Sequence, residues 1–74
     1  MDFSEALRAL QIGSSVRRQG WPHGHFLSLV AEGVASIGDD YLGSFLVLHI
    51  EGHGPVPWTP TQGDLLACDW WVMP

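Results

Sequence analysis

The chain has 74 residues, three arginines, no lysine, one cysteine and a formal net charge of −5 at pH 7. A chain of this length forms one domain that buries only about 60% of the surface its unfolded form exposes, so its own hydrophobic core is marginal. The acidic balance argues against a nucleic-acid polymer as partner, because such binding requires a basic surface, and a single cysteine excludes an intramolecular disulfide.

The first predicted element is an amphipathic helix at the amino terminus. Apolar side chains recur at i, i+3, i+4 and i+7, on Phe3, Ala6, Leu7 and Leu10. Asp2 and Glu5 have the spacing of a capping box, in which each side chain accepts a hydrogen bond from the other residue's backbone. Gly13 supplies the left-handed residue that commonly ends a helix.

Two strands joined by a turn follow the helix. Residues 15–21 and 25–30 both alternate as strands do, and Pro22, His23 and Gly24 between them are typical of a turn. These segments predict a β-hairpin with Phe26 and Leu27 on opposite faces. Residues 31–43 are rich in glycine and aspartate, so we expect a long loop there that holds a short strand at residues 34–37.

The second half of the chain predicts two strands, a short helix and a closing strand. Residues 44–50 alternate clearly, and residues 56–58 can return as a short strand that Pro57 confines to an edge or a bulge. Thr61 and Asp64 have the spacing of a second capping box, which predicts a short helix through Ala67. Residues 69–73 predict the last strand. The predicted fold is α+β: a small antiparallel β-sheet packed on one N-terminal helix, with a short helical turn near the C-terminus.

Composition also bears on assembly and compartment. Four tryptophans and three phenylalanines are difficult to bury in so small a core, so we expect a homo-oligomer. No apolar stretch approaches the roughly 20 residues that span a bilayer, and no basic region precedes an apolar run at the amino terminus. A lone cysteine fits a reducing compartment, so we expect a soluble, cytoplasmic protein with no membrane partner.

Catalysis and metal binding have little support in the sequence. No hydroxyl or thiol falls in a nucleophile motif such as G-x-S-x-G, so no catalytic residue is predicted, and Cys68 is expected to be a small buried residue. His23 and His25 lie in a turn, and His49 and His53 straddle another, so neither pair has the helical i, i+4 geometry of a specific metal site. Surface histidines are the preferred interpretation, and neither metal nor other cofactor is predicted.

A pocket for a small ligand is the stronger functional interpretation. Flat rings that could stack on a base come from Trp21, Phe26, Trp58 and Trp70. Directional donors and acceptors come from Arg18, Thr61, Gln62 and Asp64. This mixture is typical of a largely apolar binding pocket. The alternative is purely structural, with the tryptophans in the core or a subunit interface, and the residues alone do not separate the two.

Five segments, taken in order, resemble one family: Phe3-x-Glu5-Ala6-Leu7-x-Ala9-Leu10-x-x-Gly13, Val16-x-Arg18-x-Gly20-Trp21, Phe26-Leu27-x-Leu29-Val30, Val56-Pro57-Trp58 and Gln62-x-Asp64-x-Leu66-Ala67-x-Asp69-Trp70. Over nearly its whole length the chain resembles the phage and prophage family of the Thoeris anti-defence protein of the second type. The resemblance implies a homotetramer of sheet-and-helix domains. It also implies that each domain, residues 1–74, sequesters cyclic ADP-ribose-type signals, and in some members cyclic dinucleotides, without cleaving them in an infected or lysogenic bacterial host.

The resemblance further implies a set of ligand-binding residues, namely Arg18, Trp21, Phe26, Trp58, Thr61, Gln62 and Asp64. Trp70 is expected behind them in the core. The chain departs from the family at Gly63, where threonine is common, and in the turn after Trp21, which is one residue shorter and lacks a lysine. Two rival functions are a hydrolase of the same signal and a module that binds a host immune protein directly through a tryptophan surface.

Overall fold

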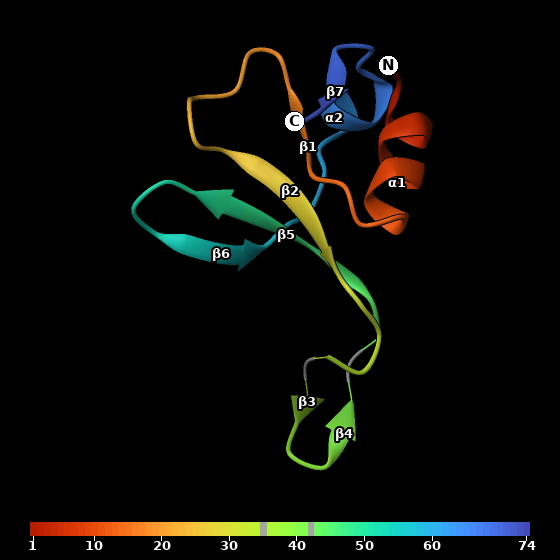
Figure 1. Ribbon diagram of the computed structural model, residues 1–74, viewed down its shortest axis with the longest axis vertical. Helices are drawn as coiled ribbons and strands as arrows, with labels where there is room; N and C mark the ends of the chain where they lie inside the picture. Colours follow the sequence, from red (N-terminus) through yellow and green to blue (C-terminus); the bar gives the residue numbers. More distant parts are fainter. Residues whose placement is uncertain (35, 42) are drawn as a thin grey trace.

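The computed structural model describes residues 1–34, 36–41 and 43–74, and it confirms the predicted α+β fold (Figure 1). The elements follow in the order α1 (Phe3–Gln11), β1 (Val16–Arg18), β2 (Phe26–Val30), β3 (Ser36–Ile37), β4 (Asp40–Tyr41), β5 (Phe45–Ile50), β6 (Gly54–Pro57), α2 (Gln62–Leu66) and β7 (Trp70–Val72). Neither helix in these ranges has the length and apolar character needed to cross a bilayer.

Five strands form one antiparallel sheet in the order β6-β5-β2-β1-β7. The β2–β5 ladder at its centre runs from Phe26 opposite His49 to Val30 opposite Phe45. The predicted hairpin is confirmed, because β1 pairs with β2 through Val16 and Leu27. The last strand, β7, returns to pair with β1 and lies near the amino terminus (Figure 1).

The helix α1 begins and ends where the sequence predicts. The Glu5 backbone N–H donates to Asp2 Oδ1 at 2.9 Å, and the Asp2 N–H donates to Glu5 Oε1 at 3.2 Å, so the capping box is complete. Gly13 has a φ of 95° just after the helix, a left-handed conformation that glycine adopts without a Cβ penalty.

The hydrophobic core lies between α1 and one face of the sheet. Its fully buried members come from α1 and from the three strands under it, namely Ala6, Leu10, Val16, Leu27 and Trp70. All five are at most 1% exposed. Full burial of a large apolar side chain contributes about 1.5–3 kcal/mol relative to exposure, so the four larger members of this set each stabilise the fold.

The helix α2 is short but well anchored. The Asp64 N–H donates to Thr61 Oγ1 at 3.1 Å and the Thr61 N–H donates to Asp64 Oδ2 at 2.9 Å, which confirms the second capping box. The helix ends at Leu66, one residue earlier than predicted, because Ala67 has extended backbone angles.

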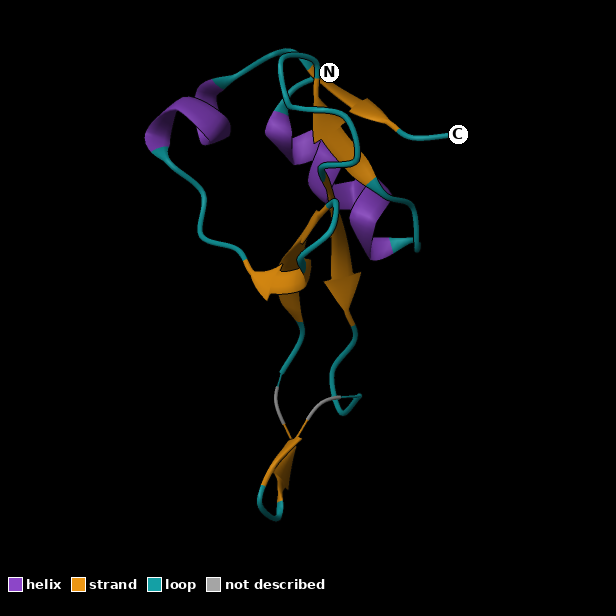
Figure 2. Ribbon diagram, turned by 90° about the vertical axis from the view of Figure 1, so that its left-hand side faces the viewer, coloured by secondary structure: helices purple, strands orange, loops and turns teal. Residues whose placement is uncertain are grey.

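Between β2 and β5 the chain forms a two-stranded ribbon, β3 with β4, that projects away from the sheet (Figure 1, Figure 2). The short strand expected at residues 34–37 is present only as Ser36–Ile37, since Val34 lies in a turn and residue 35 is outside the described ranges. The strand β4 was not predicted. Gly38, with a φ of 60°, allows the tight reversal that joins the two strands.

Both edges of the large sheet have features that hinder pairing with a further strand. On β6, Pro55 and Pro57 have no backbone N–H to donate to a neighbouring strand. The prediction that Pro57 marks an edge is confirmed, because β6 is the outermost strand. On β7, the Trp70 N–H donates to the Met1 carbonyl at 3.1 Å, and the Met1 amine donates to the Trp70 carbonyl at 2.8 Å. The amino terminus therefore occupies the outer edge of β7 at Trp70.

Candidate functional site

The aromatic rings of Phe3, Trp21, Trp58 and Trp70 form one cluster on the core side of the sheet. Trp70 lies at its centre and is 1% exposed, as its predicted place in the core requires. Phe3 and Trp21 meet its ring edge-on at centroid distances of 5.3 Å each, and Trp58 does so at 6.1 Å. Such edge-to-face pairs are each worth about 0.5–1.5 kcal/mol beyond simple burial. Trp21 and Trp58 are only half-buried, so parts of both indoles face solvent.

Arg18 lies on β1 next to this cluster, opposite Trp70 in the sheet register. Its Nε donates to Asp69 Oδ1 at 2.9 Å and its Nη1 donates to Asp64 Oδ1 at 3.1 Å. A guanidinium has five N–H donors, so donors remain for a further acceptor, and the side chain is 28% exposed. Arg18 is therefore fixed in position yet still able to donate to a ligand.

The side chains of Arg18, Asp64 and Asp69 form one group of paired charges. The hydrogen bonds that Arg18 donates to Asp69, and secondly to Asp64, raise the pKa of Arg18 above its ordinary value. Burial would raise the pKa of Asp64, but the Thr61 N–H and hydroxyl and the Arg18 guanidinium together hold it below the ordinary aspartate value. At neutral pH one positive and two negative charges leave the group at −1, so it does not attract an anion as a whole, and only directed N–H groups can favour a phosphate.

Five of the seven predicted ligand-binding residues are brought into one region, namely Arg18, Trp21, Trp58, Thr61 and Asp64. Asp64 is 8% exposed and both of its carboxylate oxygens already accept hydrogen bonds, Oδ1 from Arg18 and Oδ2 from Thr61. Asp64 therefore holds Arg18 and Thr61 in position. Gln62 is exposed on the first turn of α2, and no side-chain hydrogen bond engages it among the described residues.

Phe26 is not part of this region within one chain. Its neighbour Leu27 faces α1, so Phe26 points to the opposite face of the sheet. There its ring stacks on His49 with centroids 4.4 Å apart and planes 9° apart. The alternation of residues 25–30 predicts that Phe26 and Leu27 lie on opposite faces of the sheet. It does not predict which of these faces packs against the helix.

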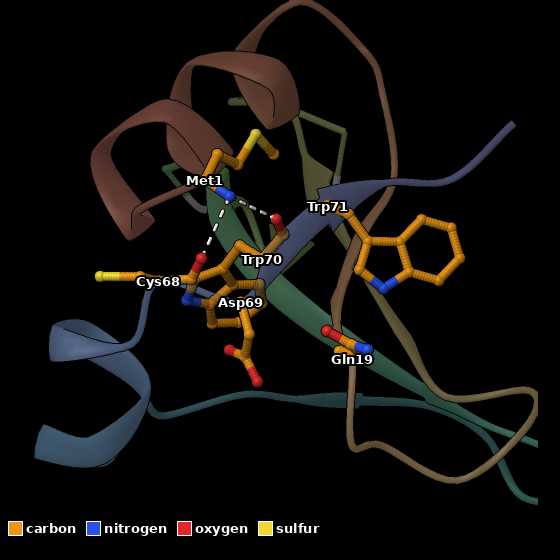
Figure 3. Close-up of a pocket in the computed structure, with 6 residues that line it drawn as sticks. All are labelled: Met1, Gln19, Cys68, Asp69, Trp70 and Trp71. Carbon is orange, nitrogen blue, oxygen red and sulfur yellow. Dashed lines mark hydrogen bonds between the residues drawn. The ribbon is translucent and has the colours of Figure 1, made fainter.

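A surface depression of about 480 Å³ lies beside the aromatic cluster (Figure 3). It is lined by Met1, Gln19, Cys68, Asp69, Trp70 and Trp71. None of the seven predicted residues lines it, although Asp69 connects it to Arg18. Its volume falls within the about 300–1,000 Å³ of typical ligand pockets. In Figure 3 the Asp69 carboxylate and the Gln19 amide lie between the Cys68 thiol and the Trp71 indole.

The sequence did not point to most of this lining. Met1 belongs to it only because its amine donates to the Cys68 and Trp70 carbonyls, at 3.2 Å and 2.8 Å. Cys68 is exposed, so its prediction as a small buried residue is wrong. The reason is local: Cys68 lies in the bend between α2 and β7, where Trp70 fills the core position.

The histidines and acidic residues show no metal-ligating arrangement in the described parts of the chain, where no three His, Cys, Asp or Glu side chains come together. His49 instead shares a hydrogen bond of 2.7 Å between its Nε2 and Ser28 Oγ. The ring of His49 is thus occupied on its face by Phe26 and on its edge by Ser28.

Comparison with known families gives one clear result. The family model described as Tad2-like, a Thoeris anti-defense 2-like domain, matches residues 1–73. A comparison with curated proteins gave no match.

Proposed function

Because the chain belongs to the Thoeris anti-defense 2-like family, we propose that it acts as a sponge for the signal of Thoeris-type bacterial immunity. It binds a cyclic ADP-ribose-type molecule, and possible further ligands include cyclic dinucleotides used by related immune systems. Sequestration keeps the signal from its effector without breaking a bond. The protein works in the cytoplasm of an infected or lysogenic cell, where a phage gene of this kind is expressed.

The observation that carries this proposal is the position of Arg18 beside two half-buried indoles. Arg18 is held by Asp64 and Asp69 and keeps unused N–H donors. Trp21 and Trp58, whose centroids lie 6.3 Å apart, offer partly exposed ring faces. Stacking of a base on an aromatic side chain is worth about 1–3 kcal/mol, and a prepositioned donor loses little entropy on binding. Stacking faces and fixed donors are what tight binding of a nucleotide requires.

Binding without cleavage is favoured by the state of the nearest carboxylates. Both Asp64 and Asp69 accept hydrogen bonds from Arg18, and the pKa of Asp64 lies below its ordinary value. A general base works best when its pKa lies near the working pH. A strongly ionised, hydrogen-bonded carboxylate is poorly suited to that role, so we prefer a sponge to the rival hydrolase.

The proposal includes a homo-oligomer, a tetramer as in the family it resembles. Phe26 points away from Arg18 and the indoles of its own chain. It therefore does not reach a ligand held there, and it lies on a surface that can contact a second copy. Association of copies would also stabilise a chain whose own core is marginal.

Calorimetry with purified protein and cyclic ADP-ribose, followed by cyclic dinucleotides, tests the proposal. We expect saturable binding of at least one of them, and after heating the complex we expect mass spectrometry to find the ligand intact. A cleaved ligand would identify the hydrolase. No binding heat with any nucleotide, together with capture of a host immune protein, would support the rival interaction module.

A further inference from the structure

The face of the sheet opposite α1 has an unusual composition. Leu27, Leu29, Leu46 and Leu48 point toward the core side, so the alternate residues of β2 and β5 point away from it. These outward side chains form what we call the outer face: Phe26, Ser28, Val30, Phe45, Val47 and His49. By register, Pro55 and Pro57 of β6 extend it. An antiparallel sheet that faces water usually alternates apolar-in with polar-out, but this face is mostly apolar on its outer side as well.

The two polar members of the outer face satisfy each other. Ser28 Oγ and His49 Nε2 are 2.7 Å apart, and the His49 ring is stacked on Phe26. A buried polar group is tolerated when it is hydrogen-bonded and costly when it is not. Covering the outer face with another apolar surface would therefore keep the Ser28–His49 hydrogen bond, and of these two side chains only His49 Nδ1 would still need a polar partner.

Neither helix of the described residues covers this face. The helix α1 packs against the core side, and α2 joins that side through the hydrogen bond from Trp70 Nε1 to the Asp64 carbonyl. Even so, Val47 at the centre of the face is only 7% exposed. On the same side of the sheet, β1 adds one charged side chain, Arg17, which is buried. Arg17 donates to the Trp21 carbonyl, and its guanidinium carbon lies 5.6 Å from the centre of the Trp71 ring.

The charges of the chain lie elsewhere. Of its eight acidic residues, two begin α1, three lie in the projecting segment between β2 and β5, one is in the β5–β6 turn, and Asp64 and Asp69 flank Arg18. The outer face has none. Two copies that each carry a net charge of −5 repel wherever acidic surfaces meet. The outer face carries no acidic side chain, so it is where they can approach with the least repulsion.

We infer that the outer face docks against the same face of a second copy, sheet on sheet, as a two-fold symmetric contact. Face-to-face sheets pack about 10 Å apart with interdigitated side chains, and a two-fold contact uses one patch twice. Sheet extension through β6 is disfavoured because Pro55 and Pro57 lack donors. This inference rests on the oligomer in the proposed function and names the surface that forms it.

The test is the mass of the ligand-free protein in solution, measured by light scattering after size exclusion. The wild type is expected above the 8.1 kDa of one chain. Phe45→Glu and Phe45→Arg each place a charge on the outer face and are each expected to fall to about half the wild-type mass or less. Both variants are expected to keep the circular dichroism spectrum and the melting transition of a folded chain, so that a lower mass reports dissociation and not misfolding.

Ile12→Glu is the matched control, because Ile12 is 83% exposed and lies beyond α1 on the other side of the molecule. It is expected to keep the wild-type mass. A monomeric wild type, unchanged mass for both Phe45 variants, or dissociation by Ile12→Glu would each overturn the inference. Nucleotide binding is measured separately by calorimetry, so failure of this interface is distinguishable from failure of the sponge function.

Discussion

The indole N–H of Trp70 donates a 2.9 Å hydrogen bond to the backbone carbonyl of Asp64. This bond fastens α2 to the last strand, while the carboxylate of the same Asp64 accepts from Arg18 on β1. Trp70→Phe removes the bond and part of a fully buried ring. We expect the free energy of unfolding to fall by about 2–4 kcal/mol, measured by urea denaturation.

Trp71→Phe is the control for that change, because Trp71 is 41% exposed and makes no such bond in the described structure. Its unfolding free energy should stay within about 0.5 kcal/mol of the wild type. Equal losses in the two variants would mean that the bond to Asp64 does not hold α2 in place.

A second prediction concerns Gly24, in the turn between β1 and β2. Its φ is +83°, and a Cβ added there would lie 2.7 Å from the Cβ of Glu51. Gly52 has nearly the same φ, +82°, but has no atom within 4 Å of an added Cβ. Both Gly→Ala variants carry a left-handed penalty of about 1–2 kcal/mol, and Gly24→Ala should lose about 1–3 kcal/mol more from the close contact. Equal melting temperatures would contradict that close approach.

Much of the fold was predictable because its signals are local. The capping boxes at Asp2 and Thr61, the period of α1 and the alternation of β5 all depend on residues a few positions apart. What escaped prediction depends on distant pairing. The bond between Arg18 and Asp69 joins residues 51 positions apart, and it follows only from the pairing of β1 with β7.

The candidate site divides in the same way. Residue chemistry predicts Arg18, Trp21 and Trp58 as ligand-binding residues, and the fold brings them together. It predicts Phe26 on the same grounds, but Phe26 lies on the other face, because residue type does not fix which side of a sheet meets the helix. The depression beside Met1 could not be predicted, since the contact between the amino terminus and β7 has no sequence pattern.

The lowered pKa of Asp64 makes stability depend on acid pH. A carboxyl whose folded pKa lies below its unfolded value of 3.8 stabilises the fold fully above that value, and this stability is lost as the pH falls through the folded pKa. The pKa of Asp2 is lowered too, mainly by the Glu5 N–H. Urea midpoints should stay level down to a pH of about 5 and decline below about 4.

Asp64→Asn should reduce stability at neutral pH and make that acid decline shallower. Asp39→Asn, in the exposed turn of the projecting ribbon, serves as the control and should leave the profile unchanged. A decline that is as steep in Asp64→Asn as in the wild type would show that other carboxyls produce it.

Gly63 offers a stabilising change. It is the second residue of α2, and a Cβ added there would lie 3.5 Å from Thr61 Oγ1, an ordinary contact. Alanine restricts the unfolded chain and favours the helix, so Gly63→Ala should raise the unfolding free energy by about 0.4–1 kcal/mol. A lower melting temperature would mean that the first turn of α2 has no room for a side chain.

The last prediction separates the aromatic cluster from the depression as the place where ligand binds. Trp58 packs on Phe3, Trp21 and Trp70 on the core side of the sheet, away from the outer face proposed as the contact between copies. Trp58→Ala should therefore abolish calorimetric binding of cyclic ADP-ribose while the mass in solution stays that of the wild type. Trp71 lines the depression instead, so Trp71→Ala should bind as the wild type does. Loss of binding in Trp71→Ala alone would move the site to the depression, and dissociation of Trp58→Ala would make Trp58 a structural residue of the assembly.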